Sequence, residues 1–323
     1  MSRSSFYLIC FIVMTFLLVL GYGAYYLFTK QGPMLSDTTI ILERGSSGYA
    51  ISRKLEESGI IHSALVFRLG LKFFSERGLL KAGEYKVQKY ASSKALINLF
   101  QSGKTLLHSI TVAEGLTSYE VMNLLKNNEK LSGSLSVVPE EGSLLPETYY
   151  FSRGQSRISL IDRMQKSMKK LKYRVWRKRP HGLPLHSIDE VIILASIVEK
   201  ETGKADERAR VAGVFINRLR LKMRLQSDPT VIYGITHGRS RLGRSLSRAD
   251  LRHSTPFNTY RIDRLPPHPI ANPGFKSIMA VINPEKSKDL YFVADGMGGH
   301  AFARTLKAHR RNVANWKKLK DQK

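Results

Sequence analysis

The sequence predicts an α+β protein that begins with one membrane-spanning helix and ends in a domain rich in helices. The run from Phe6 to Phe28 contains no charged residue. Short segments of alternating hydrophobicity then interleave with capped amphipathic helices as far as about residue 112. From Ile158 onward, helical patterns dominate until the proline-rich stretch 266–273.

The uncharged run of 23 residues is long enough to cross a hydrocarbon core of about 30 Å. A cleaved signal peptide is the rival interpretation, but its apolar region is usually only about 7–15 residues long. Arg3 before the run and Lys30 after it leave a small charge difference, which favours a cytoplasmic N-terminus. We therefore expect residues 1–30 to form a cytoplasmic tip and a transmembrane anchor. Aromatic residues at one end of the run suggest an interfacial belt: Tyr22, Tyr25, Tyr26 and Phe28.

A small α+β module is expected at residues 38–112, after a polar connector at 31–37. Ser63 and Ser92 stand where helix N-caps belong, and Gly59 is placed to end a helix. The predicted strands are 38–42, 83–88 and 106–112, and the predicted helices are 49–58, 64–74 and 93–101.

The remaining residues, 113–323, are expected to form a mixed α/β domain rich in helices. Thr117 caps a helix that runs to Glu129, and an aromatic turn follows at 144–151. Further along the chain, helices are predicted at 187–202, 205–223 and 304–319, and a short buried strand at 291–294.

The charge of the chain indicates an anionic neighbour. It has 52 Lys and Arg against 26 Asp and Glu, a formal charge of +26 and a pI near 10.2. The positive charge is spread over many segments and no nucleic-acid recognition motif is present, so nucleic acid is not expected as a partner. Anionic lipid headgroups or a carboxylate-bearing polymer at the membrane surface fit at least as well. The densest block, Lys166–Arg179, reads as the solvated basic face of a helix.

The sequence gives no sign of a metal or cofactor. Its one cysteine, Cys10, lies in the membrane segment, which excludes a disulfide framework, a thiolate metal site and a soluble cysteine nucleophile. The histidines do not occur in zinc-binding spacing. Gly296-x-Gly298 resembles the start of a dinucleotide fingerprint, but too few residues follow it to complete the βαβ unit. We therefore expect neither a metal nor a cofactor.

The most informative segment is the predicted helix at 187–202. Ser187 and Glu190 match a capping box, and Gly203 is a natural stop after the helix. Between these ends the helix carries an apolar stripe that faces its packing partner.

Glu201 lies at the end of this apolar stripe. At about 100° per residue it falls within about 40° of Leu194 and Ile197, whereas Glu199 points about 160° away. A carboxyl group in apolar surroundings, at the negative end of a helix dipole, resists ionisation and can donate a proton near neutral pH. The alternative is that Glu201 is a partly buried glutamate that pairs with a nearby arginine.

Hydrogen-bonding and aromatic residues crowd two later segments, 225–234 (LQSDPTVIYG) and 254–260 (STPFNTY). Amides, hydroxyls and aromatic rings in this density suit a sugar-binding groove. Asp228 before Pro229 also fits an ordinary N-cap, and Asn258 fits an ordinary turn. The residues predicted to line the groove are Gln226, Ser227, Asp228, Thr230, Tyr233, Asn258 and Tyr260.

Five ordered segments together carry a resemblance to a known family. They are 195–201, 214–219, 225–234, 258–260 with 265–267, and 291–296 with 298–300. With these segments the chain resembles the YceG-like family, the endolytic murein transglycosylases, over essentially its whole length. The segment 142–151 keeps the family's Pro-acid-Thr-aromatic pattern but lacks its usual aromatic residue before the proline.

The resemblance implies a LysM-like module at 38–112 and a catalytic domain at 113–323. It implies cleavage of the β-1,4 bond between N-acetylmuramic acid and N-acetylglucosamine in nascent glycan strands, with formation of a 1,6-anhydro end and no use of water. The family's catalytic glutamate corresponds to Glu201. The implied partners are peptidoglycan glycan strands, the inner (cytoplasmic) membrane and peptidoglycan synthases, with the catalytic domain on the extracytoplasmic side.

The predicted position of Glu201 at the end of an apolar stripe agrees with this implied catalytic role. A glycoside hydrolase needs two carboxylates about 5–9.5 Å apart, whereas a transglycosylase of this kind needs a single acid and base. Two alternatives remain open. Asp228 could stand close enough to make the protein a hydrolytic muramidase, or the chain could be a glycan-binding scaffold that recruits cell-wall synthases.

Overall fold

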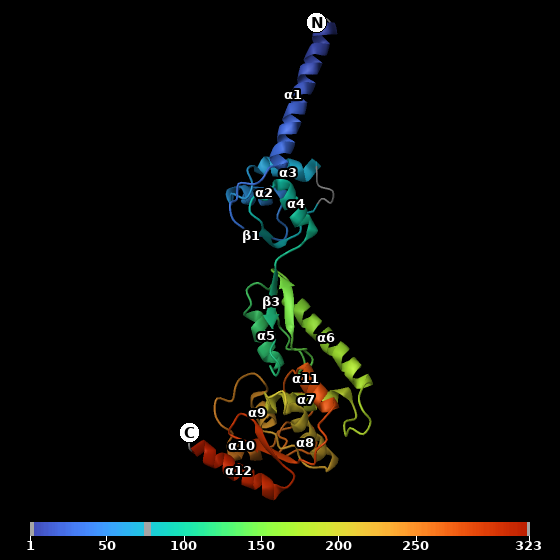
Figure 1. Cartoon of the computed structure of the whole chain (residues 1–323), viewed down its shortest axis with the longest axis vertical. Helices are drawn as coiled ribbons and strands as arrows, with labels where there is room; N and C mark the ends of the chain where they lie inside the picture. The colour runs from blue at the N-terminus through green and yellow to red at the C-terminus, as the bar shows by residue number, and fades with distance from the viewer. Residues whose placement is uncertain (1–2, 74–78, 322–323) are drawn as a thin grey trace. The chain divides into compact units, whose positions relative to one another are not determined.

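The computed structural model describes residues 3–73 and 79–321 (Figure 1). It confirms a mixed α+β protein rich in helices, with one long apolar helix near the N-terminus. The strands of the described part form three two-stranded sheets. By its contacts the chain divides into two compact units, residues 1–108 with 150–154 and residues 109–149 with 155–323.

Helix α1 (Arg3–Thr29) is the apolar segment expected from the sequence. It is long and apolar enough to cross a membrane, and most of its large hydrophobic side chains are exposed. A membrane anchor and a signal sequence both fit such a helix. Phe28 corrects the predicted aromatic belt, because it is only 2% exposed and belongs to the core of the first unit. Its ring packs on Gly70, where any larger side chain would collide with it.

The first unit combines α1 with a two-stranded sheet and three helices. Strands β1 and β2 are antiparallel, with Thr38 opposite Val87. Tyr85 and Phe100 meet edge to face in the core, with ring centroids 5.0 Å apart. Phe74, predicted as the end of a helix, lies outside the described residues. The elements are β1 (Thr38–Leu42), α2 (Gly48–Glu57), α3 (Ala64–Phe73), β2 (Gly83–Val87) and α4 (Ser93–Ser102).

Strands β3 (Leu107–Thr111) and β4 (Thr148–Ser152) pair as a second sheet, and the sequence boundaries between the two units fall within them. The aromatic turn predicted at 144–151 is therefore wrong in its second half. Tyr149 and Phe151 are buried while Tyr150 between them is exposed, which is the period-2 alternation of a strand. Pro146 just before it had favoured a turn.

The second unit contains the remaining described elements, in which helices predominate. Helix α5 begins at the predicted Thr117 cap with a complete capping box, but it ends at Lys126 instead of Glu129. Strands β5 and β6 are antiparallel, with Tyr291 opposite Ala303. The elements are α5 (Ser118–Lys126), α6 (Arg157–Arg177), α7 (Ile188–Glu201), α8 (Arg208–Arg220), α9 (Asp228–Thr236), α10 (Arg248–Arg252), α11 (Phe275–Ile282), β5 (Tyr291–Ala294), β6 (His300–Ala303) and α12 (Leu306–Asp321).

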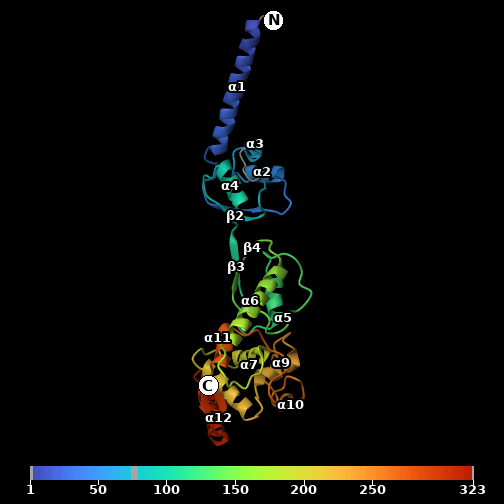
Figure 2. The same cartoon turned by 90° about the vertical axis from the view of Figure 1, so that its right-hand side faces the viewer.

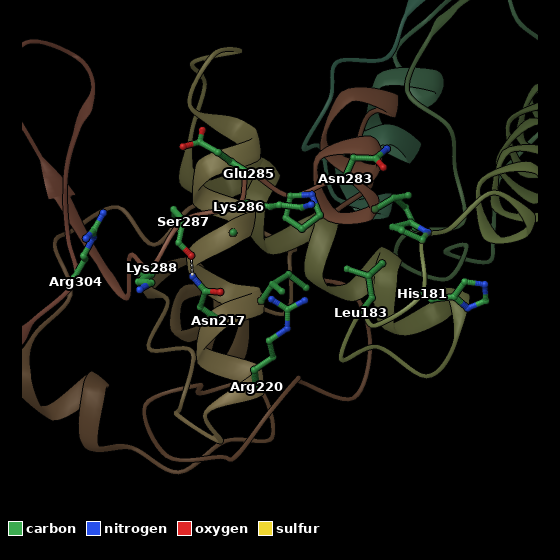
Figure 3. A pocket seen from close by; sticks show the side chains of 15 residues that line it. His181, Leu183, Asn217, Arg220, Asn283, Glu285, Lys286, Ser287, Lys288 and Arg304 are labelled. Carbon is green, nitrogen blue, oxygen red and sulfur yellow. Dashed lines mark hydrogen bonds between the residues drawn. The ribbon is translucent and has the colours of Figure 1, made fainter.

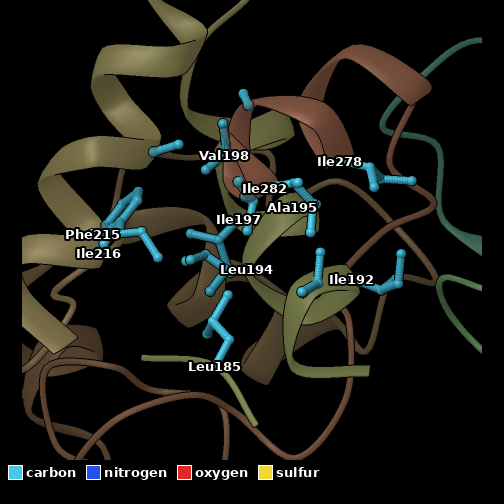
Figure 4. Packing of buried hydrophobic residues seen from close by; sticks show 14 of the residues in the cluster. Leu185, Ile192, Leu194, Ala195, Ile197, Val198, Phe215, Ile216, Ile278 and Ile282 are labelled. Carbon is cyan, nitrogen blue, oxygen red and sulfur yellow. The ribbon is translucent and has the colours of Figure 1, made fainter. Parts of the chain in front are cut away.

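Helix α7 lies at the centre of the second unit, where α8, α9 and α11 surround it (Figures 1 and 2). Its residues from Val191 to Val198 are all buried. In Figure 4 the side chains of Ile197 and Val198 meet Phe215 of α8 and Ile282 of α11. Burying a large aliphatic side chain contributes about 1.5–3 kcal/mol, so this packing fixes where the last turn of α7 lies.

Candidate active site

The start of α7 differs from the predicted capping box. The Ser187 hydroxyl accepts a hydrogen bond from the Glu190 backbone N–H (3.1 Å), as expected of an N-cap. The Glu190 carboxylate, however, accepts from the backbone N–H of His186 (2.7 Å), one residue before the cap. At the other end, α7 stops at Glu201 because Thr202 is extended, and Gly203 does not adopt the left-handed conformation of a glycine stop.

Glu201 and Glu199 face different surroundings, as the helical wheel predicted. The Glu199 carboxylate is 6% exposed, lies 3.5 Å from the Arg208 guanidinium and accepts from the backbone N–H of Gly274 (2.8 Å). These contacts tie the last turns of α7 to the starts of α8 and α11. Glu201 instead lines a cleft and contacts the start of α9. Glu199 thus lies in a buried ion pair between helices, whereas Glu201 is partly buried at the edge of a cleft.

The Glu201 carboxylate accepts a hydrogen bond of 2.5 Å from the Ser227 hydroxyl. Burial raises its pKa from 4.5 to about 7, the nearby negative charge of Asp228 acts in the same direction, and Ser227 and Arg218 oppose the rise. Near neutral pH the group is therefore present both protonated and ionised, which is what a residue that first donates and then accepts a proton requires.

A buried hydroxyl network holds Ser227 in place. Its backbone N–H donates to Thr259 Oγ1 (2.9 Å), and the Thr230 hydroxyl donates to the Ser227 carbonyl (2.6 Å). Thr230 and Thr259 also share a hydrogen bond of 2.8 Å between their hydroxyls. Because all three residues are almost fully buried, the Ser227 hydroxyl has a fixed position beside Glu201.

Asp228 is not the N-cap that the sequence suggested. Ser227 occupies that position, and Asp228 is the first residue of α9, with Pro229 in the first turn. The Asp228 carboxylate instead accepts a 2.7 Å hydrogen bond from the Tyr260 hydroxyl. Burial and the charge of Asp228 hold the pKa of Tyr260 far above its ordinary value of 10.0, so Tyr260 stays a hydrogen-bond donor.

Arg218 is a charged residue of the site that the sequence analysis missed. It is 7% exposed, and its guanidinium donates to the carbonyls of Leu290 and Leu225 (both 2.7 Å). Its positive charge favours the ionised form of Glu201. The sequence did offer a signal for Arg218, because it is a cation among the apolar residues of the 214–219 segment.

These residues surround a cleft of about 490 Å³ in the second unit. The lining residues come from the ends of α7 and α8, the start of α9, strands β5 and β6, and helix α12. Of the predicted groove residues, Gln226, Asp228 and Tyr260 line the cleft together with Glu201, and Ser227 reaches it through its hydrogen bond. The contribution of α12 had not been predicted.

Three predicted groove residues lie elsewhere in the second unit. Thr230 is fully buried in the hydroxyl network beneath the cleft. The Asn258 amide is also buried and donates to the backbone carbonyls of Leu251 and His253 (3.1 and 2.6 Å), as a turn-forming residue does. Tyr233 lines a separate cavity of about 690 Å³.

A larger cavity, about 860 Å³, opens on a different face of α8 (Figure 3). Its lining includes the cations Arg220, Lys286 and Arg304, and its carboxylate, Glu285, is exposed. It therefore lacks a buried acid, so the Glu201 cleft is the better candidate for acid-base chemistry. Within residues 3–73 and 79–321, no group of three or more His, Cys, Asp or Glu is arranged to hold a metal ion.

Comparison with known proteins identifies the family of the chain. The model of the YceG-like family matches residues 40–315, which is most of the chain. The chain belongs to the YceG-like family. A crystal structure of a yceG-like protein from Listeria monocytogenes is 29% identical and covers 85% of this chain and 98% of its own, with a TM-score of 0.53.

Curated relatives extend this likeness over nearly the whole chain. A Bacillus subtilis protein named endolytic murein transglycosylase is 28% identical, over 94% of this chain and 91% of its own length. A Streptococcus pneumoniae protein of the same name is 29% identical over 97% of this chain. The chain spans about 65% of the length of that streptococcal relative.

Proposed function

We propose that this YceG-like protein is an endolytic lytic transglycosylase of peptidoglycan. It would cleave the β-1,4 bond between N-acetylmuramic acid and N-acetylglucosamine in nascent strands, leave 1,6-anhydro-N-acetylmuramic ends and so terminate strand elongation. The observation that carries the proposal is the single carboxyl group of Glu201, with a pKa of about 7, bound to Ser227 at the wall of a cleft. The relatives named endolytic murein transglycosylase indicate the substrate.

The proposed reaction uses one residue twice. Protonated Glu201 donates its proton to the glycosidic oxygen as the bond from that oxygen to C1 of N-acetylmuramic acid breaks. The ionised carboxylate then removes the proton from the 6-hydroxyl of the same sugar while that oxygen bonds to C1. Atoms and protons balance without water, and Glu201 ends in its starting state.

The surroundings of Glu201 suit both steps. Its burial favours the protonated form that begins the reaction, and the Ser227 hydroxyl and the Arg218 charge stabilise the carboxylate formed in between. An intramolecular nucleophile also has an effective concentration that can lower a barrier by about 7–11 kcal/mol when it is well oriented. A water molecule does not have this advantage.

A hydrolytic muramidase is the second candidate, because Asp228 lines the same cleft and carries a carboxylate. The Asp228 carboxylate accepts a hydrogen bond from Tyr260 and is exposed, which suits a residue that binds sugar hydroxyls. Its negative charge also raises the pKa of Glu201. A base that activates water would need to face the opposite side of the sugar ring from the acid. We therefore assign Asp228 to binding, and the products of cleavage decide between the two candidates.

We further propose that α1 anchors the protein in the cytoplasmic membrane, with its N-terminus in the cytoplasm and residues 31–323 outside. This placement rests on the exposed apolar surface of α1 and on the external location of peptidoglycan. The residues 38–112 would act as a LysM-like module that holds glycan, and peptidoglycan synthases would be partners at the membrane.

The direct test is digestion of uncrosslinked glycan strands by the full-length chain in detergent micelles. Shortened strands with wild type and unchanged strands with Glu201→Gln are expected. Strand binding by wild type without any cleavage would favour the glycan-binding scaffold instead.

A further inference from the structure

The C-terminal helix α12 presents one face to the active-site cleft. Its residues Leu306, His309, Val313 and Trp316 all line the cleft that Glu201 lines. Their spacing of three, four and three residues places them on a single face of the helix. At about 1.5 Å per residue this face extends over about 15 Å, which is longer than one sugar ring.

The rest of α12 explains why this face is held toward the cleft. The helix packs on β5 and β6, and the ring of His309 stacks on Tyr291 of β5, with centroids 5.2 Å apart and planes at 22°. Leu319 approaches the bare backbone of Gly296, where an added side chain would meet it at 3.2 Å. Of the basic residues of α12, Lys320 lies one turn after Trp316 on the same face, and its ammonium is over the Trp316 ring.

The lining face carries two aliphatic side chains, the His309 imidazole and the Trp316 indole, and it is partly open. Leu306 is 45% exposed although it lies on a cleft wall, and the Trp316 indole is partly buried. The Lys320 ammonium lies 5.6 Å from the Trp316 ring centroid, a surface contact that a ligand can displace. An exposed leucine alone would mean little, but an indole in the same cleft as a partly buried acid marks a binding surface.

We propose that Trp316 forms a subsite that stacks on the apolar face of a sugar ring in the glycan strand. Gln226, Asp228 and Tyr260 line the same cleft, so it offers hydrogen-bonding groups as well as the flat face of an aromatic ring. A hexose ring in its chair form has the matching character, with hydroxyl groups at its rim and C–H groups on its face. The subsite rests on the proposed function for the identity of its ligand.

Trp316 also lies just beyond residue 315, where the match to the family model ends. The assignment of Trp316 rests on the cleft lining and on the residue spacing of α12 in this chain.

Tryptophan fluorescence can test the subsite directly, because the chain has two tryptophans. The other, Trp176, lies on α6 and lines a different cavity, beside Arg179. In the full-length double variant Glu201→Gln/Trp176→Phe, Trp316 is the one remaining indole and the strand is not cleaved. Titration with uncrosslinked glycan strands should quench or shift its emission in a saturable way. The matched control, Glu201→Gln/Trp316→Phe, keeps Trp176 and should show no change.

Activity gives a second readout in the otherwise wild-type chain. Trp316→Ala should raise KM by roughly tenfold or more, as truncation of a central aromatic contact does, with a smaller effect on kcat. Trp316→Phe keeps an aromatic face and should restore most of the loss. Equal thermal unfolding midpoints for these variants and wild type show that α12 still folds.

The possible failures are distinguishable. If wild type cleaves strands but Trp316 emission does not respond at saturation, or Trp316→Ala has the wild-type KM, the subsite is refuted and the proposed function stands. If wild type neither binds nor cleaves strands, the proposed function fails and the subsite fails with it.

Discussion

Replacing Ser227 by alanine removes the hydroxyl that donates to the Glu201 carboxylate at 2.5 Å. A hydrogen bond to a charged group contributes about 1.5–3 kcal/mol, and one pKa unit corresponds to about 1.36 kcal/mol. The pKa of Glu201, about 7 in the wild type, should therefore rise by about one to two units. Because the reaction begins with protonated Glu201, the alkaline fall of kcat/KM should move to higher pH by the same amount.

Replacing Asp228 by asparagine provides a matched change of the opposite sign. Asparagine keeps an oxygen that can accept from the Tyr260 hydroxyl, but it removes the negative charge that raises the pKa of Glu201. The alkaline fall should then move to lower pH. The assay is the release of soluble fragments from uncrosslinked glycan, measured from pH 5 to 10 with the full-length chain in micelles. Shifts in the same direction for both variants, or no shift for either, would refute the assignment of Glu201 as the titrating acid.

Three further predictions concern Glu201, its neighbour Glu199 and the membrane segment. Glu201→Gln should lower activity by about 10²–10⁴-fold. Glu199→Gln should keep most activity but lower the free energy of unfolding by about 3 kcal/mol, because Arg208 loses its buried partner. Equal activity losses in the two variants would contradict the assignment of Glu201. Glu201→Gln should also stabilise the fold at alkaline pH. The folded carboxyl group keeps its proton up to about pH 7, whereas the unfolded one loses it near pH 4.5. Between these pH values the free energy of unfolding of the wild type should fall by up to about 3 kcal/mol, and that of the glutamine variant should not show this fall. Chemical denaturation at pH 4 and pH 8 measures this difference, and a variant less stable than wild type at pH 8 would count against burial as the cause of the raised pKa. Protease added to spheroplasts should digest residues 31–323, and full protection would overturn the proposed topology.

The position of Glu201 could be predicted because it depends on helical periodicity alone. The helical period turns the two carboxylates in different directions, Glu201 toward the cleft and Glu199 toward the starts of α8 and α11, although α7 is buried on all sides from Val191 to Val198. Capping residues and hydrophobic periodicity likewise predicted most of the N-caps and strands. It failed at 148–152, where pairing with β3 outweighed the turn signal of the preceding Pro146.

The composition of the cleft was harder to predict because a sequence pattern does not show which polar side chains are exposed. Thr230 and Asn258 lie in segments that do form the site, but their side chains satisfy buried backbone and hydroxyl groups. Part of the lining comes from α12, about a hundred residues after Glu201, and such long-range packing leaves no local signal. The 3-4-3 spacing from Leu306 to Trp316 places these residues on one helix face, but it does not show what that face covers.

The chemistry of the new glycan end tests the central claim most directly. Strands digested by the full-length protein in water enriched with ¹⁸O should be reduced with borohydride and analysed by mass spectrometry. If Glu201 works alone, the new ends are 1,6-anhydro-N-acetylmuramic acid, which resists reduction, contains no ¹⁸O and is one water lighter than a hydrolysis product. Reducible ends that carry ¹⁸O would contradict the account and identify a muramidase, with Asp228 as the first candidate for the base that activates water.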